Sequence, residues 1–292
     1  MDTVVWAHFF GIEKRTATAP DFEDAVRAVW ELGEEPGERE LELSADDTRI
    51  RIERFTEQGD WIEGEVVRVQ TSNIPPEAFP EGLQRSRAQS QGHSMVFRYH
   101  KRMHVLLAEK NRIGMTVSRF LRYLKRNDPL ARYVAPPTAD EDSWAKFGRK
   151  TISRFSVGIS AIADPADIGG VAGAVSSASK RLHDMTHAPT VHISMYSGGA
   201  EDGLEKGAIR GAIETLLGGD PNYKVTALSV SGEDEDDRGS TAIDFLDDVL
   251  REREEIDLTE LDADQSYNER IRFLHDCFAT HIDYLERYYG MG

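Results

Sequence analysis

The residue types best suited to chemistry in this sequence are arginines and lysines that could bind phosphate groups. In residues 115–127, Arg119, Arg122 and Arg126 recur at helical spacing, and Thr116 is a favourable residue at the start of a helix. An arginine guanidinium can donate two parallel hydrogen bonds to one phosphate, so this spacing predicts a phosphate-binding helix face. Together with a basic hairpin before the helix, the predicted DNA-contacting residues are Arg98, Lys101, Arg102, Lys110, Arg112, Arg119, Arg122, Lys125 and Arg126.

These basic residues lie in a middle segment whose charge differs from that of the rest of the chain. Residues 85–181 contain 18 Lys and Arg against 7 Asp and Glu, a net charge of +11. Residues 1–84 and 182–292 carry net charges of −12 and −16, which brings the whole chain to −17. The separation favours an anion-binding surface; the alternative is a solvated basic face that acidic neighbours neutralise in the fold.

Histidine and cysteine positions do not predict a metal site. His183 and His187 are four residues apart near a predicted helix end, with His192 beyond them, but zinc normally needs three or four ligands. Cys277 and His281 could share one face of the last helix, and two ligands again make a poor site. We expect surface or capping histidines, a small buried cysteine and no bound metal.

Two glycine-rich turns and several carboxylate pairs are equally unspecific. Residues 167–173 and 197–200 each precede or open a helix, where free N–H groups could hold a phosphate, but neither matches a nucleotide-binding fingerprint. Carboxylate pairs such as Asp247 with Asp248 arise readily in a chain with 52 Asp and Glu. No catalytic residue and no cofactor are predicted.

The elements that carry these residues predict an α+β fold with an N-terminal antiparallel sheet. Alternating apolar residues predict strands and 3.6-residue periodicity predicts helices. Prolines at 129, 136 and 137, followed by an acidic run, predict a domain boundary, giving domains 1–137 and 138–292. The predicted N-terminal elements are strands 3–12, 40–43, 49–55 and 61–71, helix 22–32, a polar loop 80–92, the basic hairpin 96–110 and helix 115–127.

The C-terminal half predicts an αβ domain that ends in a long helix. Residues 241–258 have mixed periodicity, and we cannot distinguish helix from strand there. The last helix has a wide apolar stripe and a tyrosine-rich end, which could serve a homodimer or could pack on its own domain. The predicted elements are strands 151–161, 191–196 and 223–230 and helices 166–185, 204–217 and 267–289.

The composition of the chain indicates the cellular compartment in which we expect the protein. No window approaches 18 uncharged apolar residues, so no membrane insertion is expected. The first residues lack the features of a signal peptide, and Cys277 is the only cysteine, so no internal disulfide can form. A cytoplasmic location fits these features best.

The order of the segments resembles a known bacterial and phage family. The runs are WIEGEVVR at 61–68 and HVLLAEKNRIG at 104–114, followed by the basic helix, a strand–helix–strand unit at 152–196 and a terminal helix containing Cys277. This layout is similar to that of the lambdoid phage-exclusion family (RexA-like) and related defence-associated proteins. The resemblance implies a two-domain α+β protein that self-associates, binds double-stranded DNA with little sequence preference and acts in anti-phage defence. It carries over no catalytic residue.

Three functions follow as hypotheses. The first is a non-catalytic DNA-binding protein in bacterial anti-phage defence, with another defence-system protein as a candidate partner. The second is an interaction module whose basic segment binds an acidic partner or the chain's own acidic flank. The third is an enzyme of unrecognised type acting on a phosphorylated ligand at the glycine-rich turns.

Overall fold

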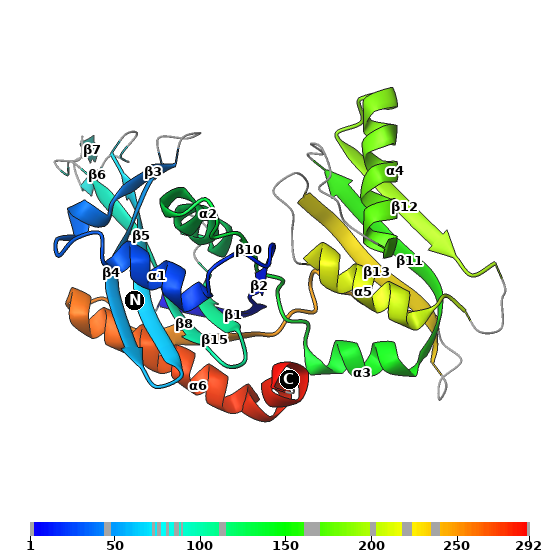
Figure 1. Cartoon of the computed structure of the whole chain (residues 1–292). Helices are drawn as coiled ribbons and strands as arrows, with labels where there is room; N and C mark the ends of the chain where they lie inside the picture. Colours follow the sequence, from blue (N-terminus) through cyan, green and yellow to red (C-terminus); the bar gives the residue numbers. More distant parts are fainter. Residues whose placement is uncertain are drawn as a thin grey trace. The chain divides into compact units, whose positions relative to one another are not determined.

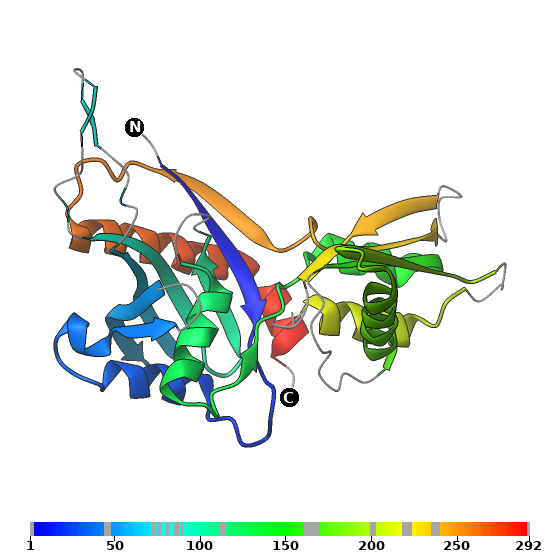
Figure 2. The same ribbon diagram turned by 90° about the horizontal axis from the view of Figure 1, so that it is seen from above.

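The computed structural model divides the chain into two compact units, described here one at a time (Figures 1 and 2). The first unit comprises residues 1–133 and 252–292, and the second comprises residues 134–251. This corrects the predicted division into 1–137 and 138–292, because the last helix packs on the N-terminal sheet. The structure describes residues 3–43, 48–71, 74, 77–79, 82–84, 88, 90–110, 115–160, 170–198, 203–217, 224–234 and 240–290.

A seven-stranded sheet forms the framework of the first unit, which confirms the expected N-terminal antiparallel sheet. The pairs from β1 through β9, β8, β5 and β4 to β3 are all antiparallel. In spatial order the strands are β15 (Arg251–Ile256), β1 (Thr3–Gly11), β9 (Val105–Glu109), β8 (Gln91–His100), β5 (Trp61–Gln70), β4 (Thr48–Gln58) and β3 (Leu41–Leu43).

Helices cover both faces of this sheet, so its central strands are buried on both sides. Helix α6 (Ala263–Tyr289) packs on β8, β9 and β1, while α1 (Phe22–Trp30) and α2 (Val117–Asn127) contact β4 and β3 on the other face. Successive side chains of a strand point to opposite faces. In β8, Tyr99 therefore packs against Phe22 of α1, while His100 stacks against Phe278 of α6.

A buried charge cluster joins α6 to the sheet. Arg270, which is 8% exposed, forms ion pairs with Glu65 of β5 and with Glu109 of β9. Its Nη1 lies 3.1 Å from Glu109 Oε2 and 3.0 Å from Ser94 Oγ. Burial raises the pKa of Glu109, and the charge of Arg270 opposes that rise. The apolar stripe of α6 lies on the same face as Arg270, with Leu274 and Leu285 fully buried.

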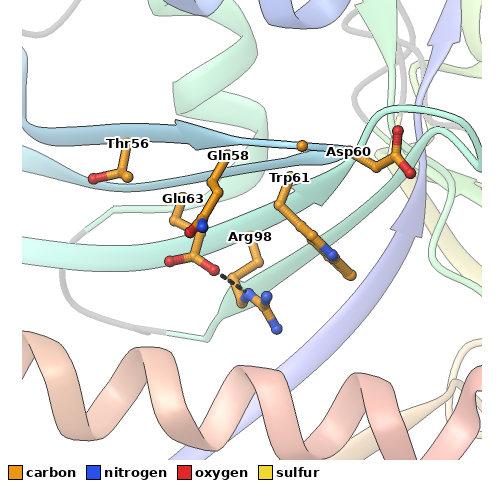
Figure 3. A pocket seen from close by; sticks show the side chains of 7 residues that line it. Thr56, Gln58, Asp60, Trp61, Glu63 and Arg98 are labelled. Atoms are coloured by element: carbon orange, nitrogen blue, oxygen red, sulfur yellow. Dashed lines mark hydrogen bonds and ion pairs between the residues drawn. The ribbon is translucent and has the colours of Figure 1, made fainter.

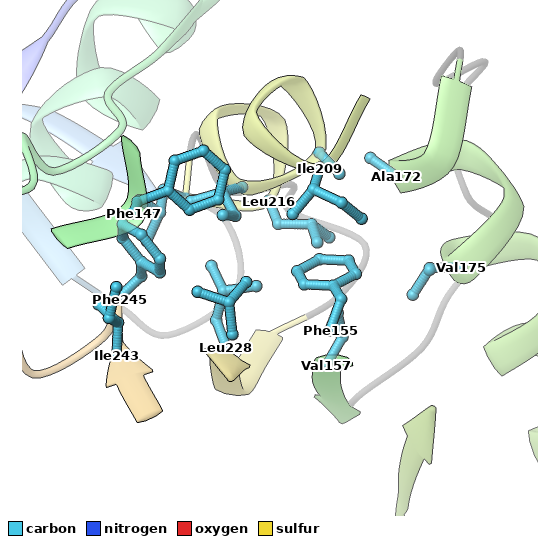
Figure 4. Packing of buried hydrophobic residues seen from close by; sticks show 14 of the residues in the cluster. Phe147, Phe155, Val157, Ala172, Val175, Ile209, Leu216, Leu228, Ile243 and Phe245 are labelled. Atoms are coloured by element: carbon cyan, nitrogen blue, oxygen red, sulfur yellow. The ribbon is translucent and has the colours of Figure 1, made fainter. Parts of the chain in front are cut away.

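The second unit is a four-stranded antiparallel sheet whose helices contribute to one apolar core. Figure 4 shows Phe155 and Leu228 of the sheet packed with Ile209 and Leu216 of a helix. The strand order is β12 (Thr190–Tyr196), β11 (Lys150–Ser160), β13 (Lys224–Asp234) and β14 (Ser240–Asp244), and the helices are α3 (Glu141–Arg149), α4 (Gly170–Thr186) and α5 (Lys206–Leu217).

Several elements differ from the sequence-based expectation. The loop predicted at 80–92 includes β7 (Gly82–Gln84), which pairs with β6 (Glu77–Phe79), and the start of β8. Helix α3 was not predicted, because its acidic start resembles a linker; Asp140 caps it by accepting a hydrogen bond from Ser143 N. The undetermined segment 241–258 contributes β14 and β15 to two different sheets. Smaller elements are β2 (Glu13–Lys14), η1 (Pro36–Arg39) and β10 (Tyr133–Val134).

Among the described residues, no helix combines the length and the apolar character that crossing a membrane requires.

Candidate nucleic-acid interface

Helix α2 carries the most accessible part of the predicted basic surface. It begins after Thr116, whose hydroxyl accepts a hydrogen bond from Arg119 N, as the sequence predicted. Its inner face, formed by Phe120, Tyr123 and Leu124, is fully buried. Residues at i and i+3 or i+4 share a helix face, so the basic residues between these apolar ones point away from the sheet.

Tyr123 attaches α2 to the sheet and to η1 through two hydrogen bonds of its hydroxyl group. Its hydroxyl donates to Arg39 O at 2.7 Å and accepts from Ile52 N at 3.2 Å. Burial raises the pKa of this hydroxyl, so it stays protonated and keeps donating at physiological pH. Phe120 adds ring contacts with Phe97 at 4.9 Å and Phe22 at 5.8 Å between centroids. The helix is therefore attached to β4, β8 and α1.

Arg122, Lys125 and Arg126 form the outer face of α2, and all three are exposed. Within the part of the chain that the structure describes, no carboxylate forms an ion pair with any of them. The helix contains no Asp or Glu of its own. The nearest acidic residue in sequence, Asp128, accepts a hydrogen bond from Leu130 N through its side chain. These three cations are called the α2 basic face.

Arg98 lies apart from this face and is buried under α6. It is 4% exposed, its Nε donates to Glu63 Oε1 at 2.7 Å, and its guanidinium lies 4.1 Å from the ring centre of Trp61 (Figure 3). These residues line a cavity of about 280 Å³ beside the β4–β5 turn. Burial lowers the pKa of Arg98, and Glu63 opposes the effect. Because Arg98 is buried and paired with Glu63, it is not part of an exposed basic surface.

The β8–β9 turn is basic in sequence but neutralised in the fold. Lys101 Nζ lies 3.0 Å from Glu57 Oε1, and Arg102 Nε lies 2.9 Å from Asp60 Oδ2. Glu57 also binds Arg27, and hydrogen bonds from Arg27 and Lys101 lower the pKa of Glu57. Acids of the β4–β5 turn therefore offset this part of the predicted surface.

The remaining predicted residues are not part of the α2 basic face. Lys110 is exposed at the end of β9, and its backbone N donates to Trp6 O at 2.8 Å. Arg119 is half-buried, and Arg112 lies outside the described residues. Arg132, which the sequence analysis did not select, is exposed in the turn after α2 and donates from Nε to Pro129 O. Its nearness to the basic helix in sequence could have identified it.

Comparison with known proteins adds no family. No protein-family model matches the chain, and a search of curated proteins returns no significant match. The phage-exclusion resemblance therefore stays an expectation, and the function is argued from the residues themselves.

The histidines have local structural contacts. His183 Nδ1 lies 2.7 Å from Ala188 O at the end of α4, and His281 Nε2 lies 2.7 Å from Glu252 Oε1. His192 lies on the sheet of the second unit. The described residues contain no group of three or more His, Cys, Asp or Glu arranged to hold a metal ion.

The glycine-rich turns lie partly outside the described residues. The structure describes 170–173 of the first, which begin α4, and 197–198 of the second.

Cys277 is buried against the sheet, and its thiol should be unreactive in the folded protein. Burial raises the pKa of Cys277 to about 12, with nearby carboxylates adding to the effect. Because the thiolate is the nucleophile, we expect labelling by a disulfide reagent at pH 8 to be slower by about three orders of magnitude than in denaturant. Since the chain has one cysteine, thiol absorbance measures this rate directly. Rapid labelling of the native protein would show that α6 opens locally.

Proposed function

We propose that this protein binds double-stranded DNA through the α2 basic face with little sequence preference. The role we assign is a non-catalytic one in bacterial anti-phage defence, in the cytoplasm. The observation that carries the proposal is the exposure of Arg122, Lys125 and Arg126 without described ion-pair partners. By contrast, the exposed Arg49 and Arg102 of the first unit are paired with carboxylates.

The net charge of −17 is compatible with such local binding. At physiological ionic strength the Debye length is about 8 Å, so distant carboxylates are screened from a phosphate that touches α2. Each neutralised phosphate releases counterions, and this release supplies sequence-independent affinity. A helix face that contacts only the phosphates of the DNA backbone positions the protein on the duplex but does not distinguish one base sequence from another.

The test is the salt dependence of duplex binding by a triple variant. Replacing Arg122, Lys125 and Arg126 by glutamine should reduce the slope of log affinity against log salt by roughly 3, about 0.9 for each phosphate contact. Fluorescence anisotropy with a labelled duplex measures both affinities between about 50 and 200 mM salt. Two unrelated duplex sequences should give the same loss.

A matched control changes net charge by the same amount elsewhere in the first unit. The control variant replaces Arg49, Arg102 and Arg272, which are exposed and ion-paired, by glutamine. It should retain nearly the wild-type slope. If both variants lose affinity equally, the effect is one of total charge and α2 is not the interface. If the wild type binds no duplex even at low salt, while an acidic protein partner is retained, the interaction-module hypothesis replaces this one.

A further inference from the structure

One face of the sheet in the second unit carries polar side chains and is not covered by the described helices. Phe155, Val157 and Ile159 of β11 point into the core with residues of α3, α4 and α5 (Figure 4). Because side chains alternate along a strand, Arg154 and Ser156 point to the opposite face.

Seven side chains on three adjacent strands define what we call the hydroxyl face. Arg154 lies opposite Tyr196 on one side and Ser231 on the other, and Ser156 lies opposite Ser194 and Ser229. The face comprises Arg154, Ser156, His192, Ser194, Tyr196, Ser229 and Ser231. All seven are exposed or half-buried.

Arg154 is held in place by neutral groups. Its Nε donates to Ser156 Oγ at 2.8 Å, and its Nη2 donates to Ser194 Oγ at 3.3 Å. Its guanidinium lies 5.3 Å from the ring centre of Tyr196. No carboxylate among the described residues forms an ion pair with Arg154. The guanidinium is therefore pre-positioned and its charge is available to an anion.

Two aromatic rings lie on the same strand of this face. Tyr196 is 63% exposed, which is unusual for so large a ring. The imidazole of His192 occupies the space above Gly158, where a Cβ would lie only 2.6 Å from His192 Cε1. Tyr196 and His192 are four residues apart, which places them about 13 Å from each other along the strand.

The local charge of the face favours a polyanion. Strands β11 and β12 contain no Asp or Glu, although the chain contains 52. Glu233 and Asp244 lie on β13 and β14, opposite Thr151 and Ser229. The acidic residues therefore lie toward β13 and β14, while the two strands that carry Arg154, His192 and Tyr196 contain none.

We propose that the hydroxyl face binds single-stranded RNA, a site distinct from the α2 basic face. Bases stack on Tyr196 and His192, and a phosphate accepts hydrogen bonds from Arg154. The serine hydroxyls can bond to the 2′-hydroxyl, a group that DNA lacks. With a single arginine among many hydroxyls, the face depends on hydrogen bonding and stacking more than on charge.

The experiment compares oligouridine and oligodeoxyuridine of about 15 nucleotides, which differ only in the 2′-hydroxyl. In fluorescence anisotropy at physiological salt the wild type should bind the RNA more tightly. Tyr196→Ala should weaken RNA binding roughly tenfold or more, whereas Tyr196→Phe should stay close to wild type because it keeps the ring. Arg154→Gln should also weaken binding.

Two controls separate this site from the duplex-binding proposal. Met185→Ala removes another exposed apolar side chain, 80% exposed on α4, and should leave RNA binding unchanged. The α2 triple variant should retain RNA binding, so failure of duplex binding alone leaves this inference intact. Equal affinity for the two oligomers, or full RNA binding by a folded Tyr196→Ala variant, would overturn it. Thermal unfolding verifies that each variant is folded.

Discussion

Replacing Arg270 by methionine is expected to lower the free energy of unfolding of the first unit by about 3–5 kcal/mol. The substitution leaves the buried Glu109 without its cation, beside Glu65, whose remaining cationic partner is Arg54. Two like charges in a poorly solvated site raise each other's cost. Chemical denaturation at neutral pH, followed by tryptophan fluorescence, measures the loss.

The pH dependence of this loss follows from the pKa of Glu109, which burial raises. A carboxyl group with a raised pKa binds its proton more tightly in the folded state. Its contribution to stability is therefore fullest below the unfolded pKa and is lost as pH rises through the folded pKa. Removing Arg270 raises the pKa of Glu109 further. The stability of the variant should therefore approach that of the wild type as the pH is lowered from about 7 towards about 4.5, because Glu109 then takes up a proton.

Neighbouring substitutions make the Arg270 result specific. Arg272→Met removes a 52% exposed arginine from the same helix and should cost less than about 1 kcal/mol. Adding Glu109→Gln to Arg270→Met should recover part of the loss, because one buried charge is removed. Equal losses at Arg270 and Arg272 would show that α6 does not bury this cluster in solution.

Truncation of Phe120 to alanine is the second large effect, with an expected cost of about 3–5 kcal/mol. Phe120 is fully buried between Phe97 of β8 and Phe22 of α1. Its removal leaves a cavity under α2. One wall of this cavity is the hydrogen-bonded sheet, which cannot move in to fill the space. Equilibrium unfolding in urea measures the change.

The control for Phe120 lies on the opposite side of the same helix. Ser118 is exposed, and Ser118→Ala should change stability by no more than about 0.5 kcal/mol. If Phe120→Ala costs less than about 1 kcal/mol, α2 is not anchored as described. The α2 basic face would then lack a rigid support.

The sequence predicted local structure well where one physical signal dominates. Alternation identified β4 and β5, and helical periodicity with a threonine cap identified α2. The α+β class and the long terminal helix are confirmed. Short strands such as β14 and β15 were ambiguous because each is too brief to show a period.

Long-range pairing decided which predicted site residues are accessible, and no local pattern contains that information. Arg98 lies in β8 between two aromatic residues. It is buried because α6, which comes more than 150 residues later in the sequence, packs on this strand. Lys101 and Arg102 meet acids that lie some forty residues earlier in the chain. The exposed cations of α2 were predictable because a helix fixes its outer face by spacing alone.

The first unit is built from two segments that the second unit separates in sequence, and this affects how the protein folds during synthesis. Strand β15 and helix α6 leave the ribosome after the second unit, whereas the strands they pack against leave before it. Until α6 has emerged, the face of β8 and β9 that it packs on has no cover and Glu109 has no counter-ion. Nascent chains should therefore depend on chaperones until α6 has emerged, while the second unit, contiguous in sequence, can fold earlier.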